Sequence, residues 1–230
     1  MIGGLGPEST AEFYLNLTKK SRKYCKKYPS IVIDSISFPF ILEKEIMQEM
    51  KNEDKILPYL ISAVKRLNKA EVDFIVMPCN TLHIFINNLR EKSNVLVLSI
   101  IDETVNRIKN KGYKKVGLLA TTKTIHDKIY EIPLKSNNIE VIKPNKKQQD
   151  KLQKTELKIL ENKVNEKDKI FMKNLVIDLM RKGSEAIVLG CTDLQLILKD
   201  DFEIEIIDSL EVLTDSTFKK MIRGGEKWEK

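Results

Sequence analysis

Two cysteines stand in matching stretches of this sequence, about half of its 230 residues apart. Residues 73–82 read DFIVMPCNTL and residues 185–194 read EAIVLGCTDL. In both stretches an acidic residue opens an apolar run, and Cys79 or Cys191 follows the run just before polar residues. Short apolar runs that end in turn signals are typical of buried strands in a parallel sheet, and ligands bind beyond the carboxyl ends of such strands. The repeat therefore predicts that the two thiols face one pocket.

A pair of thiols facing one pocket could move protons. If a helix begins after each cysteine, its free N–H groups and positive end stabilise a thiolate, so we expect thiol pKa values below the usual value of about 8.5. One thiolate suits a nucleophilic enzyme. Two thiols suit a nearly symmetric reaction, in which one removes a proton from one face of a carbon and the other returns a proton to the opposite face. Asn80, Thr81 and Thr192 carry donors that could hold a carboxylate there.

The third cysteine and the histidines have plainer interpretations. Cys25 lacks comparable surroundings and is interpreted as structural. His83 lies one helical turn after Cys79, and it either hydrogen-bonds near the pocket or helps to start the helix. The cysteines and histidines match no metal-ligand spacing, so no metal site is predicted. A reversible disulfide between Cys79 and Cys191 is a minor alternative, because the chain lacks a Cys-x-x-Cys motif.

A glycine-rich segment, GGLGP at residues 3–7, precedes the first helical pattern. It lacks the G-x-G-x-x-G spacing of a dinucleotide-binding loop, and Pro7 has no N–H to donate. We interpret it as a tight turn that brings Ser9 and Thr10 to the mouth of the pocket, and we predict no cofactor. A turn of this kind normally follows a strand. Either the first strand is stunted or a few N-terminal residues are missing.

Alternating strands and helices must position these residues. Besides the two cysteine-bearing runs, strands are predicted at 31–36, 95–99, 115–120, 139–142 and 205–208. Helices are predicted at 54–69, 100–111, 125–134, 147–182 (one or two helices) and 210–223, and directly after each cysteine, whereas 38–40 is expected to open a loop. Strands alternating with helices predict an α/β protein with parallel sheets.

The composition narrows the class of protein. Apolar residues make up 42% and charged residues 32%, which is ordinary for a soluble globular chain. The net charge of +7 comes from scattered lysines, which indicates a solvated surface, or attraction of an anionic substrate, rather than a nucleic-acid interface. We expect no membrane span and no secretory leader. Three cysteines fit the reducing cytoplasm better than a disulfide scaffold.

The chain resembles the aspartate/glutamate racemase family, the cofactor-independent amino-acid racemases. The resemblance covers nearly the whole length and rests on four segments, which read GGLGP at 3–7, MPCNTLH at 77–83, LLAT at 118–121 and LGCTDL at 189–194. It implies two Rossmann-like lobes with parallel sheets, related by pseudo-twofold symmetry, with the active site between them. The expected lobes are residues 1–100, completed by the helix at 208–230, and residues 101–207. It also implies a homodimer.

The resemblance also implies roles for individual residues. Cys79 and Cys191 would be the acid/base pair. The α-carboxylate and amino group of a small amino-acid substrate would be held by Asn80, Thr81, Thr121 and Thr192.

Two departures from the family concern the substrate. Members that act on aspartate grip its side-chain carboxylate with an arginine after the second strand, but residues 35–42 contain no basic residue. They also use a lysine at the position of Leu160, although Lys158 and Lys163 are close by. The sequence thus predicts a racemase with a thiolate/thiol pair whose substrate need not be aspartate, and Phe38 and Phe40 could suit a less polar side chain. The alternatives are an isomerase or decarboxylase of another small carboxylic acid, or a non-catalytic protein that binds a small anion.

Overall fold

The computed structural model describes residues 1–198 and 202–223. The strands in these residues pair in parallel and form three sheets. Two sheets have two strands each, β1 (Ile2–Gly3) with β2 (Asp34–Ser35), and β3 (Phe74–Val76) with β4 (Leu96–Leu98). The third has the order β6-β5-β7-β8, with bounds Glu140–Ile142, Lys115–Leu119, Ala186–Leu189 and Glu205–Asp208.

Helices connect and cover these strands. In chain order they are α1 (Pro7–Cys25), α2 (Phe40–Glu49), α3 (Leu57–Lys69), α4 (Ile86–Lys92), α5 (Ile100–Lys111), α6 (Thr122–His126), α7 (Glu131–Ser136), α8 (Lys146–Leu160), α9 (Glu166–Arg181) and α10 (Ser209–Arg223). Three 3-10 turns are η1 (Glu53–Lys55), η2 (Thr81–Phe85) and η3 (Leu194–Leu196). No helix in the described part of the chain is long and apolar enough to cross a membrane.

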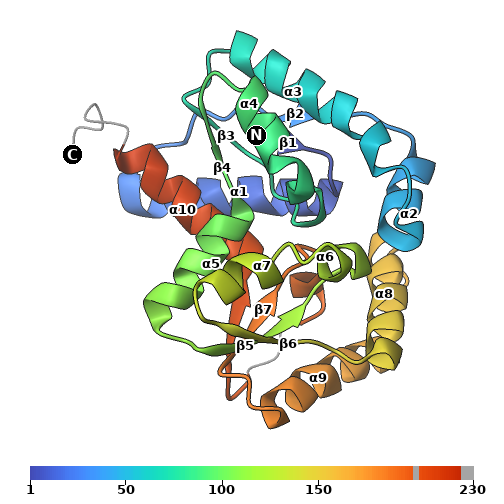
Figure 1. Cartoon of the computed structure of the whole chain (residues 1–230). Helices are drawn as coiled ribbons and strands as arrows, with labels where there is room; N and C mark the ends of the chain where they lie inside the picture. Colours follow the sequence, from blue (N-terminus) through green and yellow to red (C-terminus); the bar gives the residue numbers. More distant parts are fainter. Residues whose placement is uncertain (199–201, 224–230) are drawn as a thin grey trace.

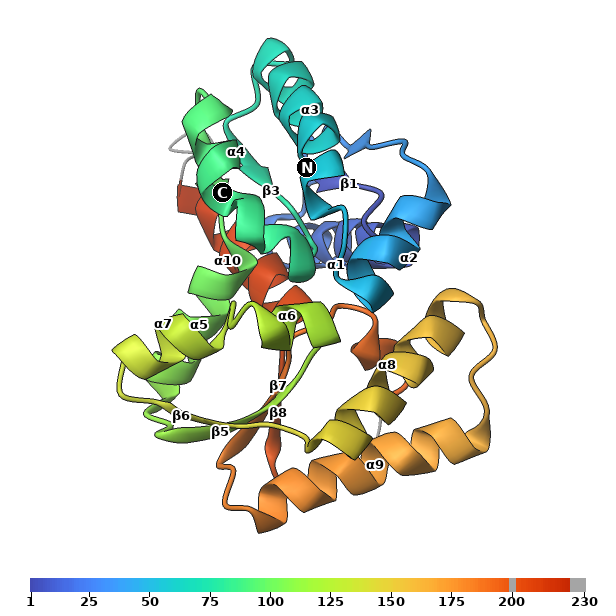
Figure 2. The same cartoon turned by 45° about the vertical axis from the view of Figure 1, so that its right-hand side comes forward.

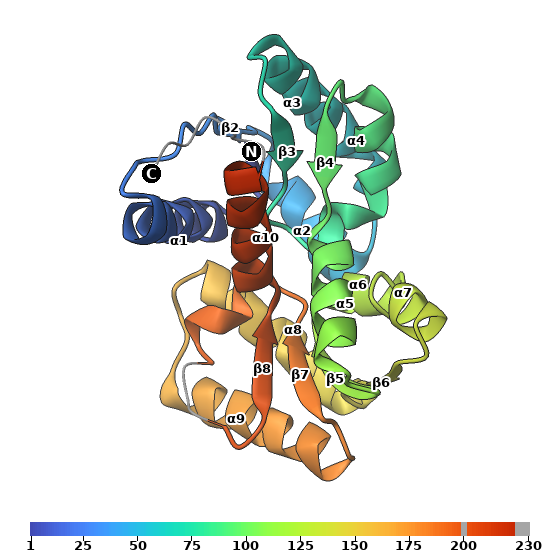
Figure 3. The same ribbon diagram turned by 90° about the vertical axis from the view of Figure 1, so that its left-hand side faces the viewer.

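The elements divide into two halves. The first four strands lie with α3 and α4 in the upper half of the molecule, and the four-stranded sheet lies with α8 and α9 in the lower half (Figures 1 and 2). α10 packs against both α1 and α5, and Figure 3 shows it standing between them. The α/β fold with parallel sheets that the sequence predicts is confirmed.

Three apolar cores hold this arrangement together. One is built from the first half alone and includes Ile2, Leu60 and Val97. A second is built from the second half and includes Leu152 and Leu189. The third joins residues of α1, α5 and α10 to the faces of β3, β5 and β7. Because this third core spans both halves, it fixes the ends of β3 and β7 relative to each other.

Local sequence signals explain where several helices begin and end. Ser99 caps α5 by accepting a hydrogen bond from the N–H of Asp102 at 3.1 Å, and Gly112 ends it with a φ of 82°. α8 and α9 each begin with a capping box, opened by Asn145 and Asn165. Such caps satisfy N–H groups that the first turn of a helix leaves unpaired.

Several sequence expectations about single elements are wrong. The strand expected at 31–36 is only two residues long, because its partner β1 offers just two residues for pairing. The helix expected at 125–134 is split into α6 and α7, where Lys128 adopts a φ of 55°. The loop expected after Phe38 is interrupted at once by α2, in which Pro39 takes the N-cap position, where a missing N–H costs nothing.

The helices expected directly after the cysteines are also wrong. Cys79 is followed by the 3-10 turn η2, and only then by α4. Cys191 is followed by the three-residue turn η3, with no α-helix between 191 and 198. Turns this short give a smaller aligned dipole than an α-helix does.

Candidate active site

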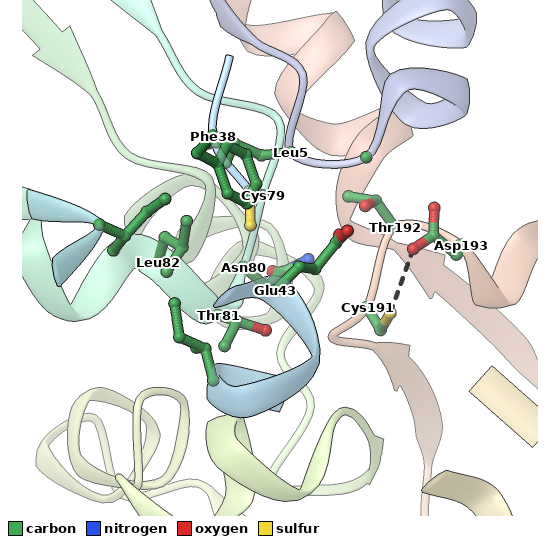
Figure 4. Close-up of a pocket in the computed structure, with 13 residues that line it drawn as sticks. Leu5, Phe38, Glu43, Cys79, Asn80, Thr81, Leu82, Cys191, Thr192 and Asp193 are labelled. Carbon is green, nitrogen blue, oxygen red and sulfur yellow. Dashed lines mark hydrogen bonds between the residues drawn. The ribbon is translucent and has the colours of Figure 1, made fainter. Parts of the chain in front are cut away.

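A small cavity lies beyond the carboxyl ends of β3 and β7, and both Cys79 and Cys191 line it (Figure 4). The space open to the centre of a water molecule is about 40 Å³, which is a few water positions. Its other lining residues are Leu5, Gly6, Phe38, Glu43, Ile46, Ile56, Asn80, Thr81, Leu82, Thr192 and Asp193. The two halves of the chain therefore contribute one thiol each to a single narrow space.

His83 holds the turn that carries Cys79. Its Nδ1–H donates to the Cys79 carbonyl at 2.5 Å, and its Nε2 accepts from the N–H of Ile100 at 3.2 Å. The ring is buried and therefore neutral, because burial lowers the pKa of His83 to about 4. His83 does not line the cavity. The bond to the Cys79 carbonyl fits the expected hydrogen bond near the pocket, and the helix at whose first residue the ring accepts a hydrogen bond is α5 rather than the one expected after Cys79.

The glycine-rich turn lines the cavity with Leu5 and Gly6, whereas Ser9 and Thr10, which were expected at the mouth of the pocket, do not line it. Ser9 Oγ donates to Asp193 Oδ1 at 2.5 Å, which ties α1 to the residues after Cys191. Thr10 faces its own turn, where its hydroxyl accepts from the N–H of Gly4 and donates to the carbonyl of Gly6, both at 3.0 Å. Gly4 has a φ of 85°, and a Cβ there would lie 3.0 Å from a backbone oxygen, so this turn requires glycine.

Asn80 and Thr81 connect the two halves beside the thiols. The Asn80 side chain accepts from Tyr130 Oη at 2.6 Å and donates to Ser209 Oγ at 3.0 Å. The Thr81 hydroxyl lies 3.1 Å from that of Thr121. Thr121 is the N-cap of α6 and is not among the residues that line the cavity, so it supports Thr81 from behind.

The acidity of the thiols differs from the sequence expectation. Burial raises the pKa of Cys79 to about 12, and the charges of Asp193 and Glu43 add to this. Burial also raises the pKa of Cys191, and Glu156 and Asp193 raise it further. The short turns after the cysteines donate hydrogen bonds but do not outweigh these effects. Both thiols are therefore protonated at neutral pH in these surroundings.

Glu156 is a buried carboxyl group that the sequence analysis missed. It lies on α8 with only 4% of its surface exposed, and one of its oxygens has no hydrogen-bond partner. Burial and the charge of Asp193 raise the pKa of Glu156 to about 8, and a hydrogen bond with Cys191 partly offsets them. Its position in the helical pattern could have revealed Glu156, because it lies on the same buried face of α8 as the apolar Leu152 and Ile159.

Glu43 is a second acidic residue that the sequence did not reveal. It lies on α2, and Figure 4 shows its carboxylate reaching into the cavity from that helix. Burial raises the pKa of Glu43, and the charges of Asp193 and Glu8 raise it further. With α2 expected to be a loop, no periodicity pointed to Glu43.

Comparison with known proteins identifies the family. A family model described as Asp/Glu/Hydantoin racemase matches residues 2–217. The chain belongs to this family. The resemblance drawn from the cysteine motifs is thereby confirmed.

Individual relatives cover nearly the whole chain. RacX of Bacillus subtilis (strain 168), a broad specificity amino-acid racemase, is 30% identical over 227 residues, which are 94% of this chain and 95% of RacX. The crystal structure of an aspartate racemase homologue from Pyrococcus horikoshii OT3 matches with a TM-score of 0.79 and 30% identity, over 96% of this chain and 97% of that chain. Aspartate racemase from Picrophilus torridus matches with a TM-score of 0.77 and 26% identity, over 95% and 91%.

Proposed function

We propose that this chain is an amino-acid racemase that transfers the α-proton between two thiols without a cofactor. The observation that carries the proposal is that Cys79 and Cys191, from matched strand ends in the two halves, line one cavity suited to a small molecule. Membership of the racemase family and the likeness to a broad specificity amino-acid racemase support this class of reaction.

The proposed reaction uses one thiol on each face of Cα. In one direction Cys191, whose own proton has passed to Glu156, acts as the thiolate and takes the proton from Cα, which breaks the C–H bond and leaves a carbanion whose charge is shared with the α-carboxylate. Cys79 then gives its thiol proton to the opposite face and becomes a thiolate. The reverse direction exchanges the two roles. Atoms and charge balance, since one proton is taken up and one is delivered.

Polar groups beside the thiols are suited to hold the substrate. The hydroxyls of Thr81 and Thr192 and the second amide N–H of Asn80 can donate to the α-carboxylate, and they stabilise the negative charge that it gains in the transition state. Thr121 orients the Thr81 hydroxyl at 3.1 Å. Asp193 has a carboxylate oxygen 4.0 Å from Cys191 Sγ, so it suits the α-ammonium group.

Substrate binding would also supply a positive charge, and a positive charge near the thiols stabilises a thiolate. Carboxylates around the cavity help to keep the pKa of both thiols high in the empty site. An ammonium group bound at Asp193 cancels part of that negative field and so lowers the thiol pKa values. Glu156, hydrogen-bonded to Cys191, can accept the proton that this thiol releases.

Exchange of the α-proton in heavy water tests the proposal. With a panel of L-amino acids, the wild-type protein is expected to form the D-enantiomer and to place deuterium at Cα, measured by chiral chromatography and mass spectrometry. Cys79→Ala and Cys191→Ala should each abolish racemisation, because one proton-transfer partner is gone. Cys25→Ala removes a half-buried thiol elsewhere and should leave the rate unchanged. Normal turnover in either of the first two variants would exclude the two-thiol mechanism.

We further propose that the racemase is a cytoplasmic homodimer. The resemblance of the cysteine motifs to the racemase family implies the dimer, and three free cysteines suit a reducing compartment. Analytical ultracentrifugation of the purified protein tests the dimer, and a monomer at micromolar concentration would contradict it.

A further inference from the structure

We propose that the substrate carries a cationic side chain, an ammonium or guanidinium group at the end of a methylene chain, and that Glu43 and Glu8 bind this group. The inference rests on the proposed function, because it names the substrate class of the same site. It is carried by a second cavity, by the carboxylates around both cavities, and by the basic residues placed elsewhere.

The second cavity adjoins the first at Asp193, which lines both. It offers about 220 Å³ to the centre of a water molecule, compared with about 40 Å³ beside the cysteines. Ile159, Leu160 and Leu196 give it apolar walls, and Glu8 lines it as well. Methylene groups pack on apolar walls while a terminal charge seeks a polar partner, so this space suits a long side chain with a charged end.

Three carboxylates converge where the cavities meet. A Cβ at Gly6 would lie 3.6 Å from Glu8 Oε2 and 3.9 Å from Asp193 Oδ1, so both oxygens lie beside one point on the cavity wall. The charges of Asp193 and Glu8 raise the pKa of Glu43, and Figure 4 shows the Glu43 side chain reaching toward Asp193. Like charges held together in a partly buried space favour a cation between them.

These carboxylates have no basic neighbour among the described residues that line the two cavities, since neither lysine nor arginine lines them. Leu160 forms part of the apolar wall. Its basic neighbours are paired elsewhere, Lys158 with Asp168 at 2.6 Å and Lys163 with Glu161 at 2.9 Å. An acidic side chain would therefore lie near carboxylates and find no cationic partner among these residues, so the less polar or acidic substrates left open by the sequence fit this space worse than a cationic one.

The charged groups of the proposed complex can be matched to partners one by one. In the proposed complex the α-carboxylate is held by neutral donors, and Asp193 pairs with the α-ammonium group. Glu43 and Glu8 then remain without a partner when the substrate has a neutral side chain. A side chain with a terminal ammonium or guanidinium group neutralises them, and charge-assisted hydrogen bonds of this kind are stronger than those between neutral groups.

Lysine and norleucine form a matched pair of test substrates, because they differ only in the terminal ammonium group. Racemisation by the wild-type full chain is measured with L-lysine, L-norleucine and L-glutamate. We expect kcat/KM for lysine to exceed that for norleucine about 100-fold, with glutamate lower still. Equal or greater kcat/KM with norleucine or glutamate would overturn the inference, although it would leave the proposed racemase function intact.

Two variants test the assigned residues. Glu43→Gln and Glu8→Gln should each lower kcat/KM for lysine about 10-fold or more and change that for norleucine less than about 3-fold. Glu8 is exposed in the first turn of α1, so its substitution tests the inference even if Glu43→Gln fails to fold. Glu91→Gln, on the exposed face of α4, removes the same charge far from both cavities and should change neither value. Equal losses with both substrates would count against a side-chain role.

Binding separates the inference from the proposed function. Calorimetry with the wild-type chain should show tighter binding of L-lysine than of L-norleucine, and Glu43→Gln should remove the difference. Lysine binding without α-proton exchange would support the cationic pocket and contradict the racemase. Absence of both lysine binding and exchange would overturn both proposals.

Discussion

The two thiols occupy matched positions after β3 and β7, yet their surroundings differ. Cys79 is half-buried among apolar residues such as Leu82 and Phe38, and its loop is held by His83. Cys191 is buried beside two carboxyl groups, those of Glu156 and Asp193. The proposed symmetric reaction would thus use an asymmetric pair, in which one thiol, Cys191, has a buried carboxyl beside it that can accept its proton.

Glu156→Gln tests the role of this acceptor. The carboxyl accepts a proton only when it is ionised, and its pKa of about 8 makes the ionised fraction rise as the pH passes from 7 to 9. We expect the wild-type kcat/KM to rise over that range. The variant should be about 100-fold slower and lack the rise. Because the equilibrium constant of racemisation is 1, the loss must be equal for both enantiomers.

A purely structural role for Glu156 predicts a different result. Gln keeps the size of the side chain, so a structural role would lower the rate without changing its pH dependence. Glu156→Asp keeps an ionisable group on α8 and should retain a pH-dependent limb. A glutamine variant with the wild-type pH profile would exclude proton transfer through this residue.

At the scale of elements, the 3-10 turn η2 positions Cys79. It begins at Thr81, directly after the cysteine loop, and His83 within it bridges that loop to the start of α5. A single side chain thereby satisfies one carbonyl and one N–H group that are buried at the junction of three segments.

His83→Ala is expected to destabilise the fold and to make its stability less sensitive to acid. Each buried group left unpaired costs roughly 1–3 kcal/mol. In the wild type the pKa of His83 is lowered to about 4 from 6.5, so the neutral ring contributes stability above pH 6.5 that is lost as the pH falls toward 4. Urea unfolding at pH 7.5 and pH 4.5 measures both effects. His126→Ala, at an exposed histidine, should cost less than about 1 kcal/mol. Equal acid sensitivity in His83→Ala and the wild type would contradict this account.

Elements whose own residues carry a clear pattern could be predicted from the sequence. Elements whose bounds depend on neighbouring segments could not. The apolar run of β7 and the Gly112 signal at the end of α5 depend on local sequence, so each element appears close to its expected bounds. The length of β2 depends on its partner β1, which lies about 30 residues earlier in the chain. α2 begins behind Pro39, in a segment whose Phe-Pro-Phe sequence indicated a loop.

At the scale of the whole molecule, the candidate site is a meeting of distant segments. The rule that ligands bind beyond the carboxyl ends of parallel strands predicted that both cysteines face one pocket, and both line one cavity although β3 and β7 belong to different sheets. The carboxylates arrive from elsewhere, Glu43 on α2, Glu156 on α8 and Glu8 on α1. Their convergence depends on how helices pack over both halves, which no local pattern encodes. The same packing sets the raised thiol pKa values, so the charge state of the site could not be predicted either.

The hydrogen bonds of Asn80 with Tyr130 and Ser209 connect the two halves beside the site. Tyr130→Phe leaves the buried Asn80 oxygen unpaired, so we expect a loss of roughly 1–3 kcal/mol in unfolding free energy, measured by urea denaturation. Racemisation should also slow about 10-fold, because Asn80 directly follows Cys79 and helps to fix its position. Tyr113→Phe is the matched control, since it removes the same hydroxyl from a part-buried bond with Glu205 at the edge of the four-stranded sheet. Equal effects of the two changes on rate would show that this junction does not position the thiol.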